Sequence, residues 1–426
     1  MARCFTEMAA LGQGVPAPHI PLPLGIFIMP SGLCLGWILF FAAASAAAEP
    51  AQPLSPDQVL GTMRSVNGYF MREHPDPGQP IPRPAGNAGQ AQRPANPYPS
   101  NIWTRAVYYE GLMGLYGIDR DPRYYDYAVR WGEAHHWMLR RSRGTAAVRS
   151  ADDQCIGQTF LDLYAADPKP ERIADLKANV EGMLADQRAD DWWWCDALQM
   201  AMPVFARLGV LTGDRGYLEK LYALYQDAKT HQGGRGLYNP DEHLWWRDRT
   251  FFPPYREPNG RNCYWARGNG WVFAALARVL DVLPADAPHR DEYLRTYREM
   301  APAILAVQRP DGFWNVSLLD PGDFGGKEVT GTSLFAYGFA LGVRRGWLPS
   351  DGYAAAAAKA WNAMAADAVH TSGFLGYVQG TGKQPSSSQP VTHDSVPDFD
   401  DFGIGCFLLA GSEVWKLAGG SSQAVR

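Results

Sequence analysis

The sequence alternates between two kinds of helical segment, and this alternation constrains the fold more than any other feature. Six segments are apolar on almost every side and rich in Ala, Gly and Leu; they begin near Ile102, Asp153, Asp196, Gly270, Thr332 and Gly403. Six others carry charge along one face and each precedes an apolar segment; they begin near Asp57, Pro122, Glu171, Gly216, Asp291 and Gly352. Helices that are apolar all round belong in an interior. We therefore predict an all-α (α/α)6 barrel of six inner and six outer helices.

The lengths of the connecting segments divide the predicted barrel into two unlike ends. Links from an inner to the next outer helix are short, as in GIDRD, AADPK and VLTGDR. Links from an outer to the next inner helix are mostly long, over residues 74–100, 230–267, 309–331 and 370–402. Because neighbours are antiparallel, the long links share the end at which the inner helices begin. Long loops in a compact domain usually carry function, so we expect the site at that end of a single domain.

The first hundred residues contain a segment that resembles an export signal. An apolar run over residues 24–48 ends in small residues before Glu49, which is the pattern of a cleaved signal peptide. We therefore predict a signal peptide over residues 1–48, an N-terminal helix and Pro/Gly-rich loop over 49–100, and the rest of the barrel over 101–420, with the whole domain at about 55–420. The protein is expected to be exported, either periplasmic or secreted. A membrane anchor formed by residues 24–48 is the alternative.

Charge and cysteine usage exclude several classes of protein. The net charge of -5 and a pI near 6.0 argue against a nucleic-acid binder. There is no GxSxG motif for a serine hydrolase and no CxxC motif for a structural zinc site. No cofactor or metal is expected, and after signal cleavage no stable membrane partner; the oligomeric state stays open. The cysteines that follow the signal are expected to be buried free thiols: Cys155, Cys195, Cys263 and Cys406.

Unusual residues gather where the inner helices are predicted to begin. They are Asp152-Asp153, WWWCD at 192–196, NPDEHLWWRD at 239–248, YWARGNGW at 264–271 and KEVTGTS at 327–333. Indole faces stack on sugar rings, and paired carboxylates act as general acid and base. Helix N-termini favour an anion, and Arg267 could hold a carboxylate through two hydrogen bonds. These residues predict a site for an anionic sugar.

Each of these features also has a structural interpretation. Asp196 could be an ordinary helix N-cap, and the Trp cluster could be core packing. Arg267 could form an ion pair with an acid of a loop, and His243 could lie on the rim. The residues alone leave these alternatives open.

Seven stretches together resemble the unsaturated rhamnogalacturonyl hydrolases of glycoside hydrolase family 105 and their relatives in family 88. The resemblance extends from about Asp57 to Ala418, and its motifs are DDQCIGQ, CDALQMAMP, GLYNPDEHLWWRD, YWARGNGWV, DGFWNVSLLDP, EVTGTSLFAYG and FGIGCFLLAGSEV. The family fold is the (α/α)6 barrel, in agreement with the helix pattern. One departure is that residues 239–242 stand between the GLY of the third motif and His243, whereas many relatives place the His soon after GLY.

The resemblance implies roles for particular residues. Asp196 matches the general acid/base, and Asp153, with Asp152 as the alternative, matches the second carboxylate. Arg267 and Trp271 match residues that line the substrate site. The other candidates for substrate contact at this end of the barrel are Trp194, His243, Arg247, Thr332, Ser333 and Asp152.

The reaction implied by the resemblance is release of a 4,5-unsaturated uronic acid from the non-reducing end of lyase-generated oligosaccharides, of rhamnogalacturonan or other pectin origin. Hydration of the enol-ether double bond requires a proton donor. We therefore expect Asp196 to be protonated at rest, with its pKa raised by the tryptophans and by Asp153. An inverting glycosidase on saturated sugars and a non-catalytic sugar-binding protein are the alternatives.

Overall fold

Six inner helices form a closed ring in the part of the chain that the computed structural model describes, residues 55–82, 96–142, 144 and 148–421. Around the ring, each contacts the next, and the last contacts the first. They are α2 (Trp103–Asp119), α5 (Ile156–Ala166) with the short α4 (Ala151–Gln154) at its start, α7 (Ala197–Thr212), α9 (Ala266–Val282), α11 (Val329–Arg344) and α13 (Phe402–Leu417). The predicted (α/α)6 barrel is confirmed.

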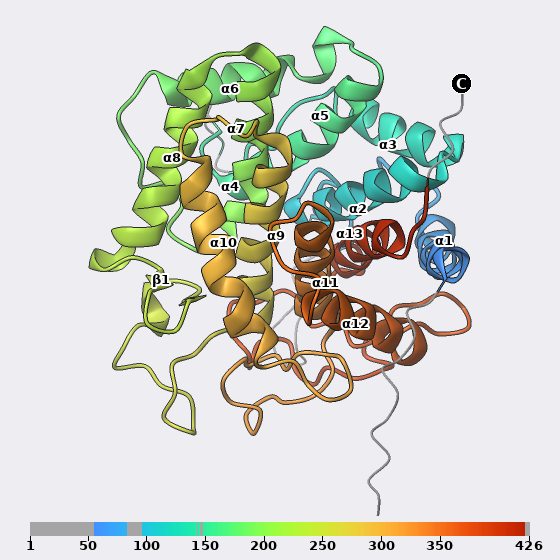
Figure 1. Ribbon diagram of the computed structural model, residues 1–426. Coiled ribbons are helices and arrows are strands. Elements are labelled where there is room, and N and C mark those ends of the chain that lie inside the picture. Colours follow the sequence, from blue (N-terminus) through green and yellow to red (C-terminus); the bar gives the residue numbers. More distant parts are fainter. Residues whose placement is uncertain (1–54, 83–95, 143, 145–147, 422–426) are drawn as a thin grey trace, which may run out of the picture. The chain divides into compact units, whose positions relative to one another are not determined.

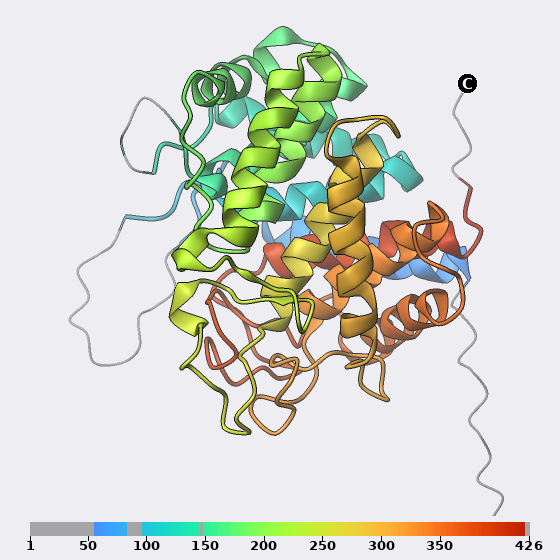
Figure 2. The same ribbon diagram turned by 60° about the vertical axis from the view of Figure 1, so that its left-hand side comes forward.

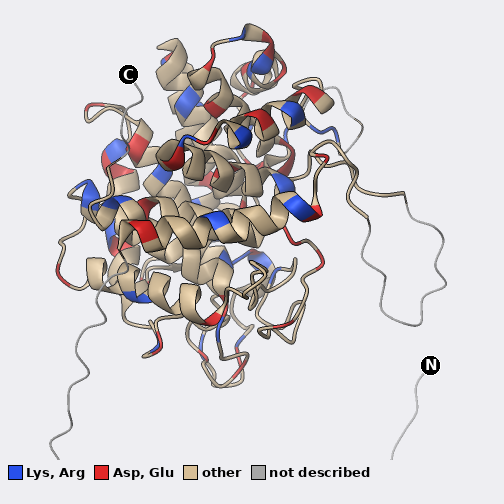
Figure 3. Cartoon of the chain, turned by 90° about the vertical axis from the view of Figure 1, so that its right-hand side faces the viewer, with Lys and Arg blue, Asp and Glu red and all other residues tan. Residues whose placement is uncertain are grey.

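The outer helices surround this ring (Figure 1). Each packs against one or two inner helices or, in one case, against the next outer helix. They are α1 (Pro56–Glu73), α3 (Pro122–Ala134), α6 (Ala174–Leu184), α8 (Arg215–Thr230), α10 (Arg290–Leu305) and α12 (Tyr353–Asp367). Short 3-10 turns follow at η1 (Pro170–Arg172), η2 (Gln232–Gly234) and η3 (Arg249–Phe251), and one two-stranded hairpin pairs β1 (Tyr238–Asn239) with β2 (Leu244–Trp245). Charged residues of both signs are interspersed over the helices that face the viewer in Figure 3.

Local sequence explains where several helices start. Ser55 and Gln58 form a capping box ahead of α1, with Pro56 at its first position. The side chains of Asp121, Asp214 and Glu328 accept backbone N–H bonds at the starts of α3, α8 and α11. The free backbone N–H groups at the starts of these helices therefore find hydrogen-bond acceptors in residues next to them in the sequence.

Close packing of the inner ring depends on small residues and on one amide. A Cβ on Gly405 of α13 would collide with the carbonyl oxygen of Val107 in α2, so only glycine permits this approach.

Pro203 within α7 has no backbone N–H and cannot donate to the carbonyl of Gln199. Gln158 Nε2 of α5 instead donates to that oxygen at 2.7 Å. The buried carbonyl is thereby satisfied.

The two ends of the barrel differ as expected. Residues 120–121, 167–169 and 213–214 are the short links at one end, here called the short-link end. The other end, here called the loop end, carries residues 231–265, 306–328 and 368–401, which lie together beneath the helices in Figures 1 and 2. Two predicted boundaries were wrong. The RGNG and TGTS segments lie inside the first turns of α9 and α11, because their backbone continues the helix, and not in the preceding loops.

The predicted signal peptide, residues 1–48, lies outside the described residues. Among the residues that are described, no helix has both the length and the apolar character needed to cross a bilayer. Cys155, Cys195, Cys263 and Cys406 are buried and free, as expected.

Candidate active site

Asp196 stands immediately before α7 at the loop end, but it does not cap the helix. It has helical backbone angles, and its side chain accepts no bond from the first turn. Its Oδ2 accepts a bond from Arg247 Nε at 3.1 Å, and the Cys195 thiol lies 3.6 Å from the same oxygen. Its Oδ1 has no partner among the described residues. Asp196 is thus a nearly buried carboxylate, 8% exposed, held by one oxygen, and the N-cap interpretation is wrong.

Arg247 lies in the segment after β2, and it joins that segment to the start of α7. Its Nη1 donates to Asp248 at 2.8 Å, and its backbone oxygen accepts from the Cys195 N–H at 2.8 Å. Burial is the largest influence on the pKa of its guanidinium and lowers it, but the charge of Asp196 and the bond to Asp248 together raise it, so that the net shift is upward. A guanidinium beside a carboxylate favours the ionised form of that carboxylate.

The neighbouring pair Asp152 and Asp153 is divided between two roles. Asp153 is buried, and its Oδ2 accepts bonds from the backbone N–H of Ser142 at 3.1 Å and from the Ser142 hydroxyl at 2.5 Å. Burial raises the pKa of Asp152 to about 7, and the charges of Asp196 and Asp153 add to the increase. The charge of Asp196 therefore acts on the pKa of Asp152. Asp153 is instead bound to Ser142 of the preceding loop.

This arrangement places the raised pKa on a different aspartate from the one expected. From the sequence, the raised pKa was assigned to Asp196. In the structure Asp196 accepts from a guanidinium, and the carboxyl group with a pKa near neutrality is Asp152. A pair of nearby carboxyl groups shares its protons as a unit. Asp152 is therefore the carboxyl group whose raised pKa suits it to donate a proton near neutral pH.

Arg267 is completely buried in the first turn of α9. Its Nη1 donates to the carbonyl of Gln379 at 2.6 Å and its Nη2 to that of Gly380 at 2.7 Å, while its guanidinium lies 4.4 Å from the Trp265 ring centroid. Burial lowers its pKa, and the charges of Glu328 and, less strongly, Asp196 oppose that decrease. The structure thus directs this guanidinium to the last long loop, and contact with a substrate carboxylate stays a prediction.

The tryptophans at the loop end are mostly buried, in agreement with the core-packing interpretation of the cluster. Trp271 is 0% exposed and packs edge-on to Trp103, which is half-buried at the start of α2. Trp194 is 5% exposed, whereas Trp193 is 47% exposed, with the Arg247 guanidinium 5.6 Å from its ring centroid. Trp193 is the accessible stacking surface next to Asp196.

Three other predicted contacts lie apart from this group. His243 occupies the hairpin turn with φ of 56°, where its Nδ1 is 3.0 Å from the hydroxyl of Tyr238. Thr332 accepts the backbone N–H of Trp314, and the Ser333 hydroxyl lies 3.2 Å from the sulfur of Met364. Each of these side chains already has a partner within the protein, and their contact with a substrate stays a prediction.

Gln379 organises the loop end and was not identified from the sequence. It is fully buried, its Oε1 accepts from Trp265 Nε1 at 2.8 Å, and its Nε2 donates to three backbone oxygens of residues 384–387. Asn269 similarly holds β2 by bonds to both backbone groups of Trp245. The signal that could have indicated Gln379 is weak, since it is an isolated amide in a Gly- and Ser-rich loop.

One group of described residues has donor atoms close enough to hold a metal ion: His370, His393 and Asp394. The two imidazoles stack, with ring centroids 3.6 Å apart, and His370 Nε2 is already 2.9 Å from the carbonyl oxygen of His393. Lone pairs of stacked rings do not converge on one point, so this geometry does not fit a metal site as it stands.

A barrel of this kind, with two coupled carboxyl groups at the start of its inner helices, defines a glycosidase of the (α/α)6 class. The chain belongs to Glycosyl Hydrolase Family 88, whose model matches residues 62–418. The enzyme class predicted from the sequence is therefore confirmed.

Curated relatives and solved structures agree with this family. The chain is 32% identical over 336 residues to an "Unsaturated 3S-rhamnoglycuronyl hydrolase" from Formosa agariphila, covering 74% of this chain and 84% of the relative. It is 29% identical to a protein of the same name from an Alteromonas species, covering 74% and 78%. A "Glycosyl hydrolase family 88 from Bacteroides vulgatus" superposes with a TM-score of 0.75 at 31% identity, covering 85% and 100%.

Proposed function

We propose that the protein hydrolyses oligosaccharides that end in a 4,5-unsaturated uronic acid and releases that acid from the non-reducing end. The observation that carries the proposal is the coupled pair at the loop end. Asp152 has a pKa of about 7, and Asp196 is held through Oδ2 with Oδ1 free of described partners. Membership of family 88 and the names of the two curated relatives support the same reaction.

The chemistry needs one proton donor and one group that activates water. Protonation of the enol ether at C4 produces a cation at C5 that the ring oxygen stabilises. Water adds at C5 and loses a proton to a carboxylate, and the resulting hemiketal opens and releases the next sugar. One proton is given and one is recovered, so the carboxyl pair returns to its starting state.

The structure favours Asp152 over Asp153 as the second carboxylate. Burial raises the pKa of Asp152 to about 7, while Arg247 donates to Asp196 and orients it. Asp153 binds Ser142 and supports the loop that precedes α4. We therefore assign the acid and base chemistry to the Asp152–Asp196 pair and a supporting role to Asp153.

The decisive test is the loss of ultraviolet absorbance of the conjugated double bond. Purified enzyme should be tested on unsaturated disaccharides derived from rhamnogalacturonan, from rhamnoglycuronyl polymers and from glycosaminoglycans. We expect turnover of the rhamnose-containing substrates, because the sequence resembles the first class and both curated relatives are named for the second. If absorbance stays constant on every substrate while saturated glycosides are cleaved, the proposal is wrong.

Export is proposed on the apolar run of residues 24–48, which ends in small residues. Expression of the full chain in a bacterial host, followed by N-terminal sequencing of the secreted or periplasmic form, tests it. A mature protein that begins near Glu49 is expected. A chain that keeps residues 24–48 and sediments with membranes would show an anchor instead.

A further inference from the structure

A chain of hydrogen bonds leads outward from Asp196 to two residues that the proposed chemistry does not use, Asp248 and Thr250. Arg247 donates from Nε to Asp196 Oδ2 at 3.1 Å and from Nη1 to Asp248 Oδ2 at 2.8 Å. Asp248 Oδ1 accepts the Thr250 hydroxyl at 2.6 Å and the Thr250 N–H at 2.8 Å. One carboxylate thus binds Arg247 through one oxygen and the following turn, η3, through the other.

Asp248 carries a fixed negative charge inside the protein. It is 3% exposed, although Arg249 and Thr250, which follow it, are exposed. A buried carboxylate is costly unless it is paired and hydrogen-bonded. Burial is the largest influence on the pKa of Asp248 and raises it, but the bonds from Thr250 and Arg247 together lower it, so that the net shift is downward. Asp248 is therefore ionised at neutral pH.

The Arg247 guanidinium is held from several sides. Its Nε and Nη1 bind two different carboxylates, and its centre lies 5.6 Å from the centroid of the Trp193 ring. A planar guanidinium that is bound at two nitrogens cannot turn without losing one of the bonds. The same side chain lines a cavity of about 390 Å³ at the loop end, together with Trp193 and Thr250. Loss of Asp248 would therefore leave a long side chain free to move at the edge of that cavity.

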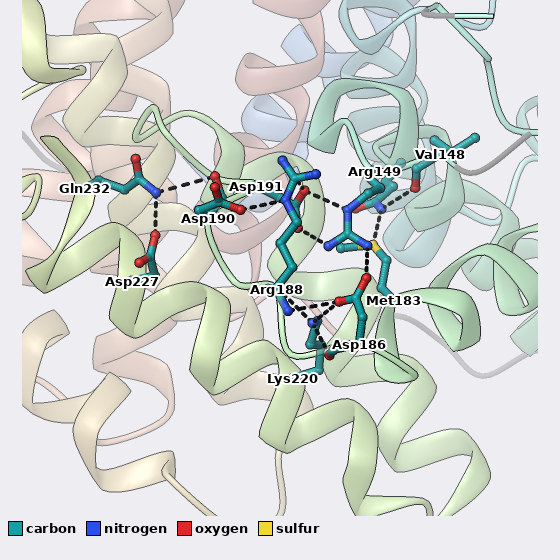
Figure 4. A network of polar contacts seen from close by, with 11 residues as sticks. Val148, Arg149, Met183, Asp186, Arg188, Asp190, Asp191, Lys220, Asp227 and Gln232 are labelled. Atoms are coloured by element: carbon teal, nitrogen blue, oxygen red, sulfur yellow. Dashed lines mark hydrogen bonds and ion pairs between the residues drawn. The ribbon is translucent and has the colours of Figure 1, made fainter. Parts of the chain in front are cut away.

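A second network of arginine and aspartate joins the loops before α4 and α7 and provides an internal comparison (Figure 4). Arg149 donates to Asp191 from Nε at 2.8 Å and from Nη2 at 2.6 Å. Asp191 is buried, like Asp248. Among the described residues, however, no hydrogen bond joins this network to Asp196, whereas Asp248 is linked to Asp196 through Arg247.

From these contacts, we propose that Asp248 is a positioning residue, which holds the Arg247 guanidinium in the orientation that binds Asp196. Thr250 fixes Asp248 in turn. Because Arg247 is kept on Oδ2, the second oxygen of Asp196 stays open to the substrate or to water. Asp248 acts through Arg247 and does not itself react. This inference deepens the proposed function and rests on it, since it assigns the reaction to the carboxyl pair.

Charge also passes along this chain of residues. Burial raises the pKa of Asp152, and the guanidinium of Arg247 opposes that increase. The charge of Asp248 offsets part of the charge of the guanidinium, so its removal, with Arg247 retained, should lower the pKa of Asp152. The other charged or titratable groups that act on the pair or on Arg247 are Arg140, Asp153, Cys195 and Arg267. These groups remain unchanged in a variant at position 248.

Asp248→Asn tests this role through kcat and its pH dependence. We expect kcat to fall about tenfold, because Arg247 loses its second anchor, while KM changes less than about twofold, because both oxygens of Asp248 are already bound within the protein. The fall in activity with rising pH should begin at a lower pH than in the wild type. An activity that is reduced by the same factor at every pH, or is not reduced, would overturn the proposal.

Asp191→Asn is the matched control, because it also separates a buried aspartate from its arginine. It should lower the melting temperature but leave the pH dependence of kcat unchanged. An equal pH shift in Asp191→Asn and Asp248→Asn would contradict positioning through Arg247.

Substitutions of the exposed Thr250 test the same link with little disturbance of the core. Thr250→Val removes the hydroxyl bond to Asp248 and should lower kcat about threefold, which is the effect of one hydrogen bond. Thr250→Ser keeps the hydroxyl and should match the wild type. If the two variants have the same kcat, the link from Thr250 to Asp248 has no part in the reaction and the proposal is wrong.

Carbon NMR titration of the aspartate carboxyl groups separates this inference from the proposed function. If the wild type hydrolyses no unsaturated substrate, but the pKa of Asp152 is lower in Asp248→Asn and unchanged in Asp191→Asn, the link to the carboxyl pair stands without the activity. An unchanged pKa of Asp152 in Asp248→Asn would overturn the link even in an active enzyme.

Discussion

The barrel holds two buried carboxylates that each lie beside an arginine and a thiol, but it uses them differently. Midway along α2, in the cavity that opens at the short-link end, Glu110 accepts from Arg278, from Gln199 at 2.9 Å and from the Cys155 thiol at 3.3 Å, so that both of its oxygens are bound. At the loop end, Asp196 has Arg247 and the Cys195 thiol on Oδ2 only. A saturated carboxylate fixes structure, whereas one with a free oxygen can exchange a proton.

The surroundings of the two carboxylates sharpen this contrast. The cavity at the short-link end is larger, about 500 Å³, and several of its charges are paired, such as Arg207 with Asp162 at 2.8 Å and Lys416 with Glu413 at 2.6 Å. At the loop end, the second carboxyl group, Asp152, is coupled to Asp196 and is titratable near neutrality. Cavity size therefore does not identify the active site in this protein; an incompletely satisfied carboxylate pair does.

The largest expected effect comes from Asp196→Asn. We expect kcat/KM to fall by about 10²- to 10⁴-fold, which is the range for loss of a general acid or base. The amide keeps an acceptor for Arg247, so the melting temperature should change little. Absorbance assays and thermal unfolding measure the two quantities. A fully active variant would move the chemistry to another residue.

The opposite outcome is expected from Glu110→Gln at the other end. Loss of this charge leaves Arg278 buried without its counterion, which costs about 3–5 kcal/mol in comparable buried pairs. Denaturant unfolding should show this loss, while kcat of the folded fraction stays within about twofold. If the variant is stable but inactive, the distinction between the two ends is wrong.

A smaller effect on rate, with a clear pH signature, is expected from Asp152→Asn. Activity of the wild type should fall as pH rises through about 7, when Asp152 loses its proton. The variant should not show this fall, and it should be about 10²-fold slower at pH 6, at the lower end of the range for loss of a general acid. Asp153→Asn is the matched control: it should keep this fall in activity but move it to lower pH, because the charge of Asp153 contributes to the raised pKa of Asp152.

The same substitution should change the pH dependence of stability. Because the pKa of Asp152 is raised in the folded state, the wild type gains stability from this group below about pH 4 and loses it as pH rises through 7. Asp152→Asn should therefore be more stable than the wild type at pH 8, by about 1–3 kcal/mol. Equal pH dependence of unfolding in both proteins would contradict the raised pKa.

The smallest effect is expected from His243→Asn. His243 contacts Tyr238 in the hairpin and not the carboxyl pair, and asparagine tolerates its positive φ. We expect less than about a threefold change in kcat/KM. A loss comparable to that of Asp196→Asn would restore His243 to the substrate site.

The sequence by itself determined the barrel, the polarity of its inner helices and the end at which the site lies. Helices that are apolar all round must be interior, and unequal link lengths distinguish the two ends. It also placed Asp196 at the start of an inner helix, because that position follows from the local pattern of residues.

Only the tertiary structure decided which groups meet. Arg247 reaches Asp196 across 51 residues, and Arg267 turns to the carbonyls of Gln379 and Gly380 more than a hundred residues away. Adjacent Asp152 and Asp153 differ in role because successive side chains on a helix point in different directions. A pKa depends on burial and on neighbouring charges in space, and the order of residues along the chain does not contain either quantity.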